Sequence, residues 1–322
     1  MNKYILKIVI FVAIPIPILF FLAYATDEGL KNSRVEYVAE WNDIFQSKIN
    51  ADILVLGSSR AWAHVSPQIL DSTFHCNSYN LGLRSSHFLM QYCRFKTLIA
   101  HNPIPKKVIL CLDIFTFERE KQLYGYEYFL PYVHDSLLIK YSKGYEGELG
   151  EVEKNFPLYK YNGKVNLMLK GLISYFHLHH FQQKNYKGYE GQAKKWDGTF
   201  DFFVKNNPKK LTQQIDNETV TAFEDFLNYC NKNNIELVLV YTPEYFEAQH
   251  YFENRTAILQ TYTQLSVKYG HLFLDYSNDE ICKKKELFYN SQHLNKEGAE
   301  IFSRLLVSDL KEKSRSKFYF GN

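Results

Sequence analysis

Three apolar runs, separated by segments of helical periodicity, constrain the fold of this chain more than any other feature. Residues 53–56 (ILVL), 108–112 (VILCL) and 235–243 (IELVLVYTP) are almost continuously apolar. Such runs indicate strands that are covered on both faces, as in parallel sheets with helices on either side. Between the first two runs, apolar residues recur at helical spacing in residues 87–100. Strands and helices therefore alternate along the chain, which predicts an α/β fold.

The same alternation gives the order of the elements. We expect strands at residues 53–56, 78–81, 108–112, 235–243 and 271–275, and helices at 87–100, 216–230, 253–268 and 296–310. These elements predict a doubly wound parallel sheet of about four or five strands with right-handed crossovers. Ligands of such sheets bind outside the carboxyl ends of the strands. Residues 57–60, 82–86 and 113–117 fall at these ends.

Residues 118–212 interrupt the alternation. They are rich in Tyr, Lys, Gly and Asn, and we expect one helix in them, near residues 165–180. Their aromatic content is too high for a disordered linker. We interpret them as an insertion lying over the carboxyl edge of the sheet, where substrate-binding loops usually lie.

An uncharged apolar segment, residues 8–25, follows Lys3 and Lys7 at the N-terminus. Its length falls within the roughly 17–25 residues that span a bilayer as a helix. The preceding lysines predict that the remainder is exported to the periplasmic or extracytoplasmic side. A cleaved signal peptide is the alternative, because Ala23-Tyr24-Ala25 resembles a cleavage site. We therefore expect residues 1–28 to be an anchor or signal segment and residues 29–322 to be one α/β domain.

The charge and the cysteine content exclude several classes of partner and ligand. The formal net charge is +3 and no long basic run is present, so we expect no nucleic-acid partner. The five cysteines are an odd number without Cys-x-x-Cys spacing, which excludes a fully paired set. Zinc-ligand spacing is absent as well. We expect neither a metal nor a cofactor.

Ser59 stands where a parallel sheet could present a nucleophile. Gly57 permits a sharp exit from the strand at residues 53–56, and Ser59 would then lie at the start of the next helix. Its own backbone N–H would point into the same pocket as a first oxyanion donor. The alternative is a helix N-cap, a role that serines at strand-to-helix junctions commonly have.

A base for Ser59 has to come from elsewhere in the chain, because a serine needs a partner that takes its proton. His293 lies in NSQHLNKEGAEIF, after the last expected strand and before the C-terminal helix. A loop in that position can reach the carboxyl edge of the first strand. Taken alone, His293 would be interpreted as a surface loop residue.

Together, LVLGSSR, YNLGLRSS, VILCLDIF and NSQHLNKEGAEIF resemble the sequence blocks of the SGNH (GDSL-like) hydrolases, over roughly residues 50–310. The resemblance is strongest to the membrane-anchored, exported branch with DltD-like and alginate-acetylation-type proteins. It implies a flavodoxin-like three-layer sandwich, with Ser59 as nucleophile and His293 as base. It also implies that the backbone N–H groups of Ser59 and Gly82 form the oxyanion hole, and it requires no cofactor.

Two positions depart from the family pattern. Asp113 stands nearest the place where the third block usually carries an asparagine that serves as a further oxyanion donor. Asn290 stands where the family has the acid of the triad, three residues before His293. Asparagine can hold the imidazole in one tautomer but cannot stabilise its positive charge. Asp275 or Asp279 could replace it, the site could work as a Ser-His dyad, or catalysis could be slow or lost.

Ser58 and Arg60 flank the expected nucleophile. Ser58 replaces the aspartate of the commoner Gly-Asp-Ser and is a second candidate nucleophile. Both residues are candidates for substrate binding, since Arg60 could hold an anionic group. An ordinary structural ion pair is the alternative role of Arg60.

The resemblance implies a membrane-anchored serine esterase or O-acyltransferase that acts on ester bonds. Its substrate would be a cell-envelope glycan, another acylated extracytoplasmic molecule or a small ester, and a transferase could take its acyl group from a membrane-bound donor protein. The alternative is a catalytically impaired binding or assembly protein of the cell envelope, which Asn290 and Asp113 favour.

Overall fold

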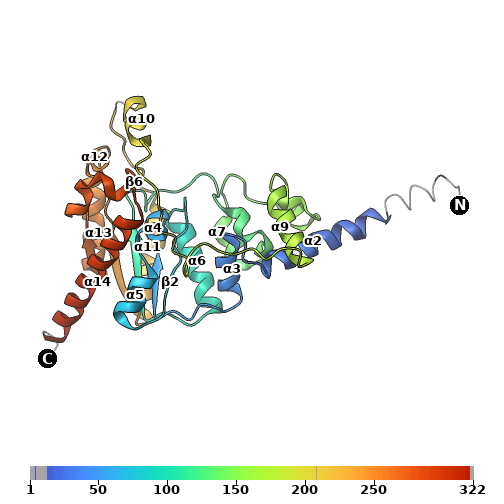
Figure 1. Cartoon of the computed structure of the whole chain (residues 1–322), viewed down its shortest axis with the longest axis horizontal. Coiled ribbons are helices and arrows are strands. Elements are labelled where there is room, and N and C mark those ends of the chain that lie inside the picture. The colour runs from blue at the N-terminus through green and yellow to red at the C-terminus, as the bar shows by residue number, and fades with distance from the viewer. Residues whose placement is uncertain (1–3, 5–12, 208, 320–322) are drawn as a thin grey trace. The chain divides into compact units, whose positions relative to one another are not determined.

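The computed structural model describes residue 4, residues 13–207 and residues 209–319 (Figure 1). The chain divides into two compact units. One comprises Met1–Gln46 and Lys121–Lys184, and the other comprises Ser47–Glu120 and Asn185–Asn322. The predicted insertion, residues 118–212, is therefore shared between the units.

A five-stranded parallel sheet forms the centre of the second unit. Its strands are β1 (Ile53–Leu56), β2 (Ser78–Asn80), β3 (Lys107–Leu112), β4 (Glu236–Tyr241) and β5 (Leu272–Asp275). The spatial order is β2-β1-β3-β4-β5, which confirms the predicted parallel sheet. The strand order reverses between β1 and β3, so the carboxyl ends of these two strands form the crevice where such folds bind ligands.

Helices cover both faces of this sheet (Figure 1). On one face, α4 (Ser59–His64), α5 (Pro67–Phe74) and α14 (Lys296–Tyr319) share a core with β1, β3 and β4 that includes Val55, Cys111 and Phe302. The other helical layer consists of α6 (Phe88–His101), α11 (Asn217–Lys232) and α13 (Arg255–Tyr269), which meet through aromatic side chains. The alternating β-α order of the sequence thus gives three layers.

Most element boundaries lie within two residues of the prediction. Asp216 caps α11, because its carboxylate accepts the backbone N–H of Thr219 at 2.8 Å. The C-terminal helix was predicted to end at residue 310 and continues instead to Tyr319. Residues 311–317 are all charged or serine, so apolar periodicity could not reveal this extension.

The first unit is helical in its described part. It contains α2 (Pro15–Lys31), α3 (Val38–Phe45), the 3₁₀ helices η1 (Tyr126–Tyr132) and η2 (Tyr159–Tyr161), α7 (Ser136–Ser142), α8 (Glu151–Asn155) and α9 (Val165–Tyr175). Helices α2 and α9 approach closely at Gly29 and Gly171, where a Cβ on Gly29 would lie 1.9 Å from the carbonyl oxygen of Gly171. The Asp27 carboxylate accepts hydrogen bonds from Lys160 at 2.7 Å and Tyr161 at 2.5 Å.

The prediction of a single helix within residues 118–212 was wrong. Besides α9, this stretch forms α7, α8 and α10 (Thr199–Asn206). These helices have five to eight residues, which is too short for a repeating apolar face. Local caps start them instead, such as the Asp135 carboxylate that accepts the N–H groups of Leu137 and Leu138.

No helix in the described part of the chain has both the length and the hydropathy of a membrane span. Residues 8–12, the beginning of the predicted span, lie outside the described residues. The described remainder of that segment, residues 13–25, lies almost entirely within α2.

Candidate active site

The turn after β1 sets the position of the candidate nucleophile. Gly57 has φ +141°, and a Cβ there would lie 2.7 Å from the carbonyl oxygen of Cys111 on β3. Only glycine tolerates that conformation without strain. Ser58 then caps α4, because its hydroxyl accepts the backbone N–H of Arg60 at 3.2 Å. The capping role thus falls to Ser58, and Ser59 becomes the first residue of the helix.

Ser59 and His293 are hydrogen-bonded, although 234 positions separate them in the sequence. Ser59 Oγ lies 2.7 Å from His293 Nε2. His293 Nδ1 lies 2.9 Å from Asn290 Oδ1. That oxygen also accepts the backbone N–H groups of Gln292 and His293, at 3.1 and 3.0 Å. Since Asn290 Oδ1 acts as an acceptor, the proton of the imidazole lies on Nδ1, and Nε2 accepts the Ser59 hydroxyl.

A two-stranded hairpin holds His293 and Asn290 in this arrangement. Strand β6 (Phe288–Asn290) pairs with β7 (His293–Leu294) in antiparallel fashion, and Asn290 lies directly opposite His293. The ring of Tyr289 stacks on the imidazole, with ring centres 5.2 Å apart and an angle of 12° between the planes. The orientation of the imidazole is therefore fixed on two sides.

The environment of His293 keeps its imidazole neutral. Burial, together with the positive charges of Arg60, Arg84 and Lys194, lowers the pKa of His293 to about 3, while Asp197 opposes the shift. The neutral imidazole has Nε2 free to accept a proton, but so low a pKa makes it a weak base at neutral pH. The amide of Asn290, which takes the place of a carboxylate beside Nδ1, supplies no negative charge to stabilise the imidazolium.

The two predicted backbone oxyanion donors differ in availability. The N–H of Ser59 has no hydrogen-bond partner among the described residues. The N–H of Gly82 donates to Asn80 Oδ1 at 2.8 Å. A Cβ at Gly82 would lie 2.3 Å from the backbone nitrogen of Trp62 on α4, so glycine is needed there for close packing. Ser59 therefore offers a free donor, and the assignment of Gly82 stays a prediction.

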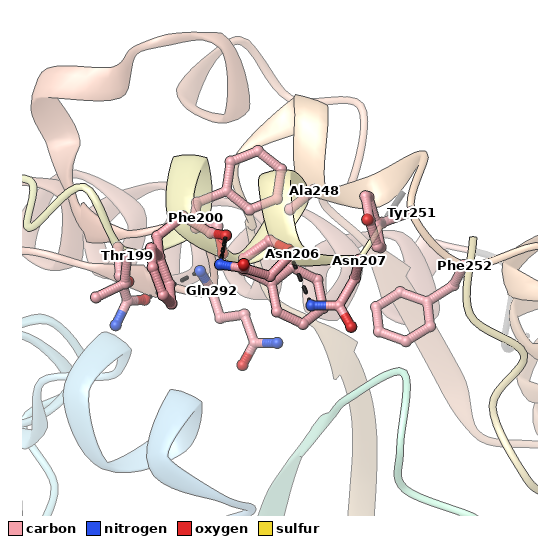
Figure 2. Close-up of a pocket in the computed structure, with 12 residues that line it drawn as sticks. Thr199, Phe200, Asn206, Asn207, Ala248, Tyr251, Phe252 and Gln292 are labelled. Carbon is pink, nitrogen blue, oxygen red and sulfur yellow. Dashed lines mark hydrogen bonds between the residues drawn. The ribbon is translucent and has the colours of Figure 1, made fainter. Parts of the chain in front are cut away.

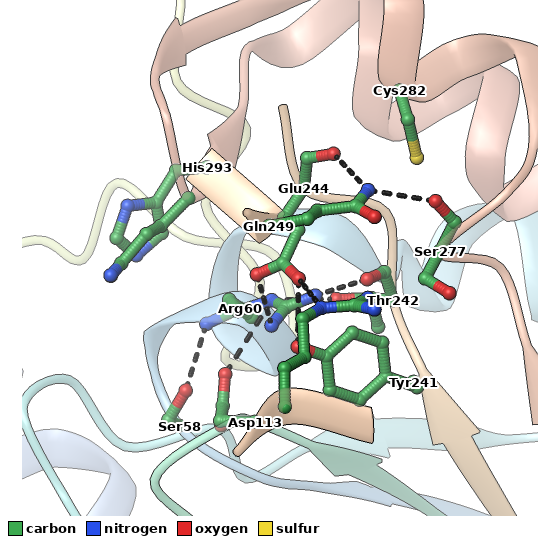
Figure 3. A network of polar contacts seen from close by, with 12 residues as sticks. Ser58, Arg60, Asp113, Tyr241, Thr242, Glu244, Gln249, Ser277, Cys282 and His293 are labelled. Carbon is green, nitrogen blue, oxygen red and sulfur yellow. Dashed lines mark hydrogen bonds and ion pairs between the residues drawn. The ribbon is translucent and has the colours of Figure 1, made fainter. Parts of the chain in front are cut away.

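Arg60 and Asp113 lie beneath the site, in a buried polar network (Figure 3). The guanidinium donates to Thr242 Oγ1 at 3.0 Å, and it forms ion pairs at 3.5 Å with Asp113 and with Glu244. Only 2% of Arg60 is exposed, and Ser58 is fully buried. Neither side chain reaches the surface, so Ser58 and Arg60 have structural partners in this network and are not placed to contact a substrate.

Asp113 is also buried, and its carboxylate pairs with Arg60. Burial raises the pKa of Asp113 to about 6, and the charge of Arg60 opposes that rise. An ionised carboxylate has no proton to donate. Asp113 therefore belongs to the supporting network with Arg60, and its ionised carboxylate cannot serve as an oxyanion donor.

His64 is a residue of this site that the sequence reasoning missed. Its Nε2 accepts the backbone N–H of Leu294 at 2.9 Å, and its Nδ1 donates to Thr242 Oγ1 at 3.1 Å. Burial lowers the pKa of His64 well below its usual value, so the ring is neutral. His64 thus ties the helix that begins with Ser59 to the strand that carries His293. No sequence pattern marks it, because its partners lie far along the chain.

The two aspartates considered as substitutes for the acid have other partners. Asp275 accepts the backbone N–H of Ser277, and Asp279 accepts that of Ile281 at the start of a 3₁₀ helix. The position beside His293 Nδ1 is held by Asn290.

Comparisons with known proteins give structural likenesses only. No family model matches the chain, and no curated protein matches it. Three solved structures are similar over most of its length. One, from Desulfitobacterium hafniense DCB-2, is assigned as a lipolytic protein of the G-D-S-L family; it has 13% identity, a TM-score of 0.37, and coverage of 80% of this chain and 99% of that one.

The second structure is assigned as an acylhydrolase from Bacteroides fragilis NCTC 9343. It has 9% identity and a TM-score of 0.39, and the match covers 81% of this chain and 86% of that one. The third is assigned as a platelet activating factor from Streptococcus pneumonia, with 15% identity, a TM-score of 0.38, and coverage of 92% of this chain and 99% of that one.

Proposed function

We propose that this protein is a serine esterase or O-acyltransferase, with Ser59 as nucleophile and His293 as general base. The observation that carries the proposal is the 2.7 Å separation of Ser59 Oγ and His293 Nε2. This pair lies after the carboxyl end of β1, beside the point where the strand order reverses. The free N–H of Ser59 adds a donor for the charge that develops in acyl transfer.

The reaction follows from this geometry. Ser59 Oγ attacks the ester carbonyl carbon while His293 Nε2 takes the hydroxyl proton, and the Ser59 N–H stabilises the oxyanion. His293 then returns the proton to the alkoxide oxygen as the ester C–O bond breaks. The alcohol departs, and the acyl group stays bound to Ser59 as an acyl-enzyme. An acceptor hydroxyl next attacks the acyl group with His293 again as base, and the bond between the acyl group and Ser59 Oγ breaks as His293 returns the proton to Ser59. Water as acceptor makes the protein an esterase, and a glycan hydroxyl makes it a transferase.

The proposed substrate is a cell-envelope glycan or another acylated extracytoplasmic molecule, and the proposed location is the outer side of a membrane. Support for anchoring comes from the uncharged residues 8–25 after Lys3 and Lys7. In α2, the side chains of Ile16, Phe20 and Tyr24 are about half exposed, which suits an apolar surrounding. A membrane-bound acyl-donor protein would be the partner of the transferase form.

Steady-state hydrolysis of p-nitrophenyl acetate tests the catalytic assignment. The full chain should show turnover that Ser59→Ala and His293→Ala each reduce by at least about 10³-fold, because the nucleophile and its base act as a unit. Ser72→Ala is the matched control, since the exposed Ser72 hydroxyl on α5 bonds only the carbonyl of Ile69. Turnover that persists in folded Ser59→Ala would refute the assignment.

A second candidate function is a non-catalytic binding protein of the cell envelope. Two observations favour it: Asn290 supplies no charge to His293, and the Gly82 N–H is already engaged by Asn80. Such a protein would bind acylated glycans equally well as wild type and as Ser59→Ala, and neither form would show turnover.

A further inference from the structure

A pocket of about 440 Å³ lies between α10 and the segment that leads to His293 (Figure 2). Its size is within the range of small-molecule sites, roughly 300–1,000 Å³. Aromatic rings form one part of the wall: Phe200, Phe202, Phe203, Tyr251 and Phe252. Neutral polar side chains form another part: Thr199, Asn206, Asn207, Asn290, Ser291 and Gln292.

The chemistry of this wall selects a neutral ligand with both flat apolar faces and hydroxyl groups. The described residues that line the pocket carry no charge, so it offers no ionic partner to a phosphate or a carboxylate. Aromatic faces pack against the C–H faces of a sugar ring, while amides serve its hydroxyls. A saturated acyl chain would leave these amides without partners.

Several polar groups at the pocket are open to a ligand. The Nδ2 groups of Asn206 and Asn207 donate back to carbonyls of α10, and neither Oδ1 atom accepts a bond from the described residues. The side-chain amide of Gln292 makes no hydrogen bond within the described chain either, although its backbone N–H donates to Asn290. The hydroxyl of Tyr251 is buried and has no partner there. Unpaired buried polar groups such as the Tyr251 hydroxyl are rare in proteins, which points to a ligand with hydrogen-bonding groups at this wall.

The pocket lies on the His293 side of the candidate active site. Asn290 lines it and bonds His293 Nδ1, while His293 Nε2 bonds Ser59. In acyl transfer, the alcohol oxygen has to be within hydrogen-bond reach of Nε2, which gives it a proton on departure or takes one on attack. The alcohol half of the substrate therefore extends from Ser59 toward the imidazole and the hairpin that carries it.

We propose that the α10 pocket binds a neutral sugar ring in the alcohol half of the ester, so that the protein acts on O-acylated sugars. This inference rests on the proposed function, whose substrate class it names. Helix α10 belongs to the predicted insertion and supplies the aromatic face, and residues 290–292 supply the link to the base.

Substrate selectivity tests the pocket. β-D-glucose pentaacetate and ethyl acetate share the acetyl group and differ in the alcohol half. Wild type should favour the sugar ester in kcat/KM by at least about 10-fold. Phe203→Ala and Gln292→Ala should each lower that ratio by about 10-fold, because each removes a wall group. Val204→Ala is the matched control, since Val204 is on α10 with similar exposure to Phe203 but does not line the pocket.

Two further measurements separate failure of this inference from failure of the proposed function. In the inactive Ser59→Ala background, calorimetry should show binding of glucose pentaacetate that Phe203→Ala weakens about 10-fold. Binding of this kind without Ser59-dependent turnover would overturn the catalytic role and keep the sugar pocket. Turnover with a ratio that Phe203→Ala leaves unchanged would overturn the pocket and keep the enzyme. If Phe203→Ala lowered only the kcat/KM for ethyl octanoate relative to ethyl acetate, the pocket would bind the acyl chain, and the proposal that it binds a sugar would be refuted.

Discussion

Replacing Asn290 by aspartate should accelerate ester hydrolysis, because it places a negative charge beside the imidazole that takes the Ser59 proton. The substitution keeps the shape of the side chain. The three N–H groups that now reach Oδ1 would all point at the new carboxylate. A carboxylate that accepts several N–H bonds stays ionised at neutral pH. The Nδ2 group that is lost has no hydrogen-bond partner among the described residues.

The size of the gain follows from the 2.9 Å contact between Asn290 Oδ1 and His293 Nδ1. An opposite charge at such a distance raises a histidine pKa by about 1–3 units. This stabilises the imidazolium by roughly 1.4–4 kcal/mol. If the transition state carries most of that charge, kcat/KM rises between about 10-fold and 10³-fold.

The assay is initial-rate hydrolysis of p-nitrophenyl acetate by wild type, Asn290→Asp and Asn290→Ala. Asn290→Ala should be slower than wild type, because the imidazole loses the acceptor that fixes its tautomer. Adding Ser59→Ala to Asn290→Asp should abolish the gain. A folded Asn290→Asp protein that is no faster than wild type would refute the reasoning that the missing charge limits the rate.

Three further predictions follow from the same structure. Hydrolysis should persist down to about pH 4, because the base works only when neutral and burial lowers the pKa of His293 to about 3; an acid limb of kcat/KM near pH 6.5 would contradict this. Arg60→Ala should lower the free energy of unfolding in urea by about 3–5 kcal/mol, since it leaves Asp113 buried without its cation and leaves Glu244 with Arg255 alone; a loss below about 1 kcal/mol would argue against the network. Gly57→Ala should lower the free energy of unfolding by about 1–3 kcal/mol and slow hydrolysis. Gly270→Ala is the control, because Gly270 also has a positive φ but has open space around its Cβ; it should lower the free energy of unfolding less and leave the rate unchanged. Equal losses in the two variants would contradict the role of close packing at Gly57.

The parts of this fold that the sequence predicts are those with a local signature. The continuous apolar runs at β1, β3 and β4 indicated a sheet covered on both faces, and the structure confirms it. Ser59 and His293 were paired because both were expected at the same edge of that sheet and because the sequence blocks around them resemble those of the SGNH hydrolases. The position of a loop relative to its strand is a topological property, so it could be inferred without coordinates.

The features that the sequence left open depend on partners far along the chain. Arg60 was weighed as a substrate contact because nothing near it in sequence identifies Thr242 and Glu244 as its partners, about 180 positions away. For the same reason His64, which bonds Leu294, gave no signal. The residue types alone do not decide whether Ser58 or Ser59 caps α4. That depends on the backbone conformation at Gly57, where the chain leaves β1.

Covalent labelling by a fluorophosphonate probe is the most direct measurement of the central claim, that His293 makes Ser59 a nucleophile. Mass spectrometry of the digested full chain should find the adduct on Ser59, and its rate of formation should fall by at least about 10²-fold in His293→Ala. The exposed Ser72 should stay unmodified. A folded wild-type protein in which Ser59 reacts no faster than Ser72, or equally fast without His293, would contradict the account.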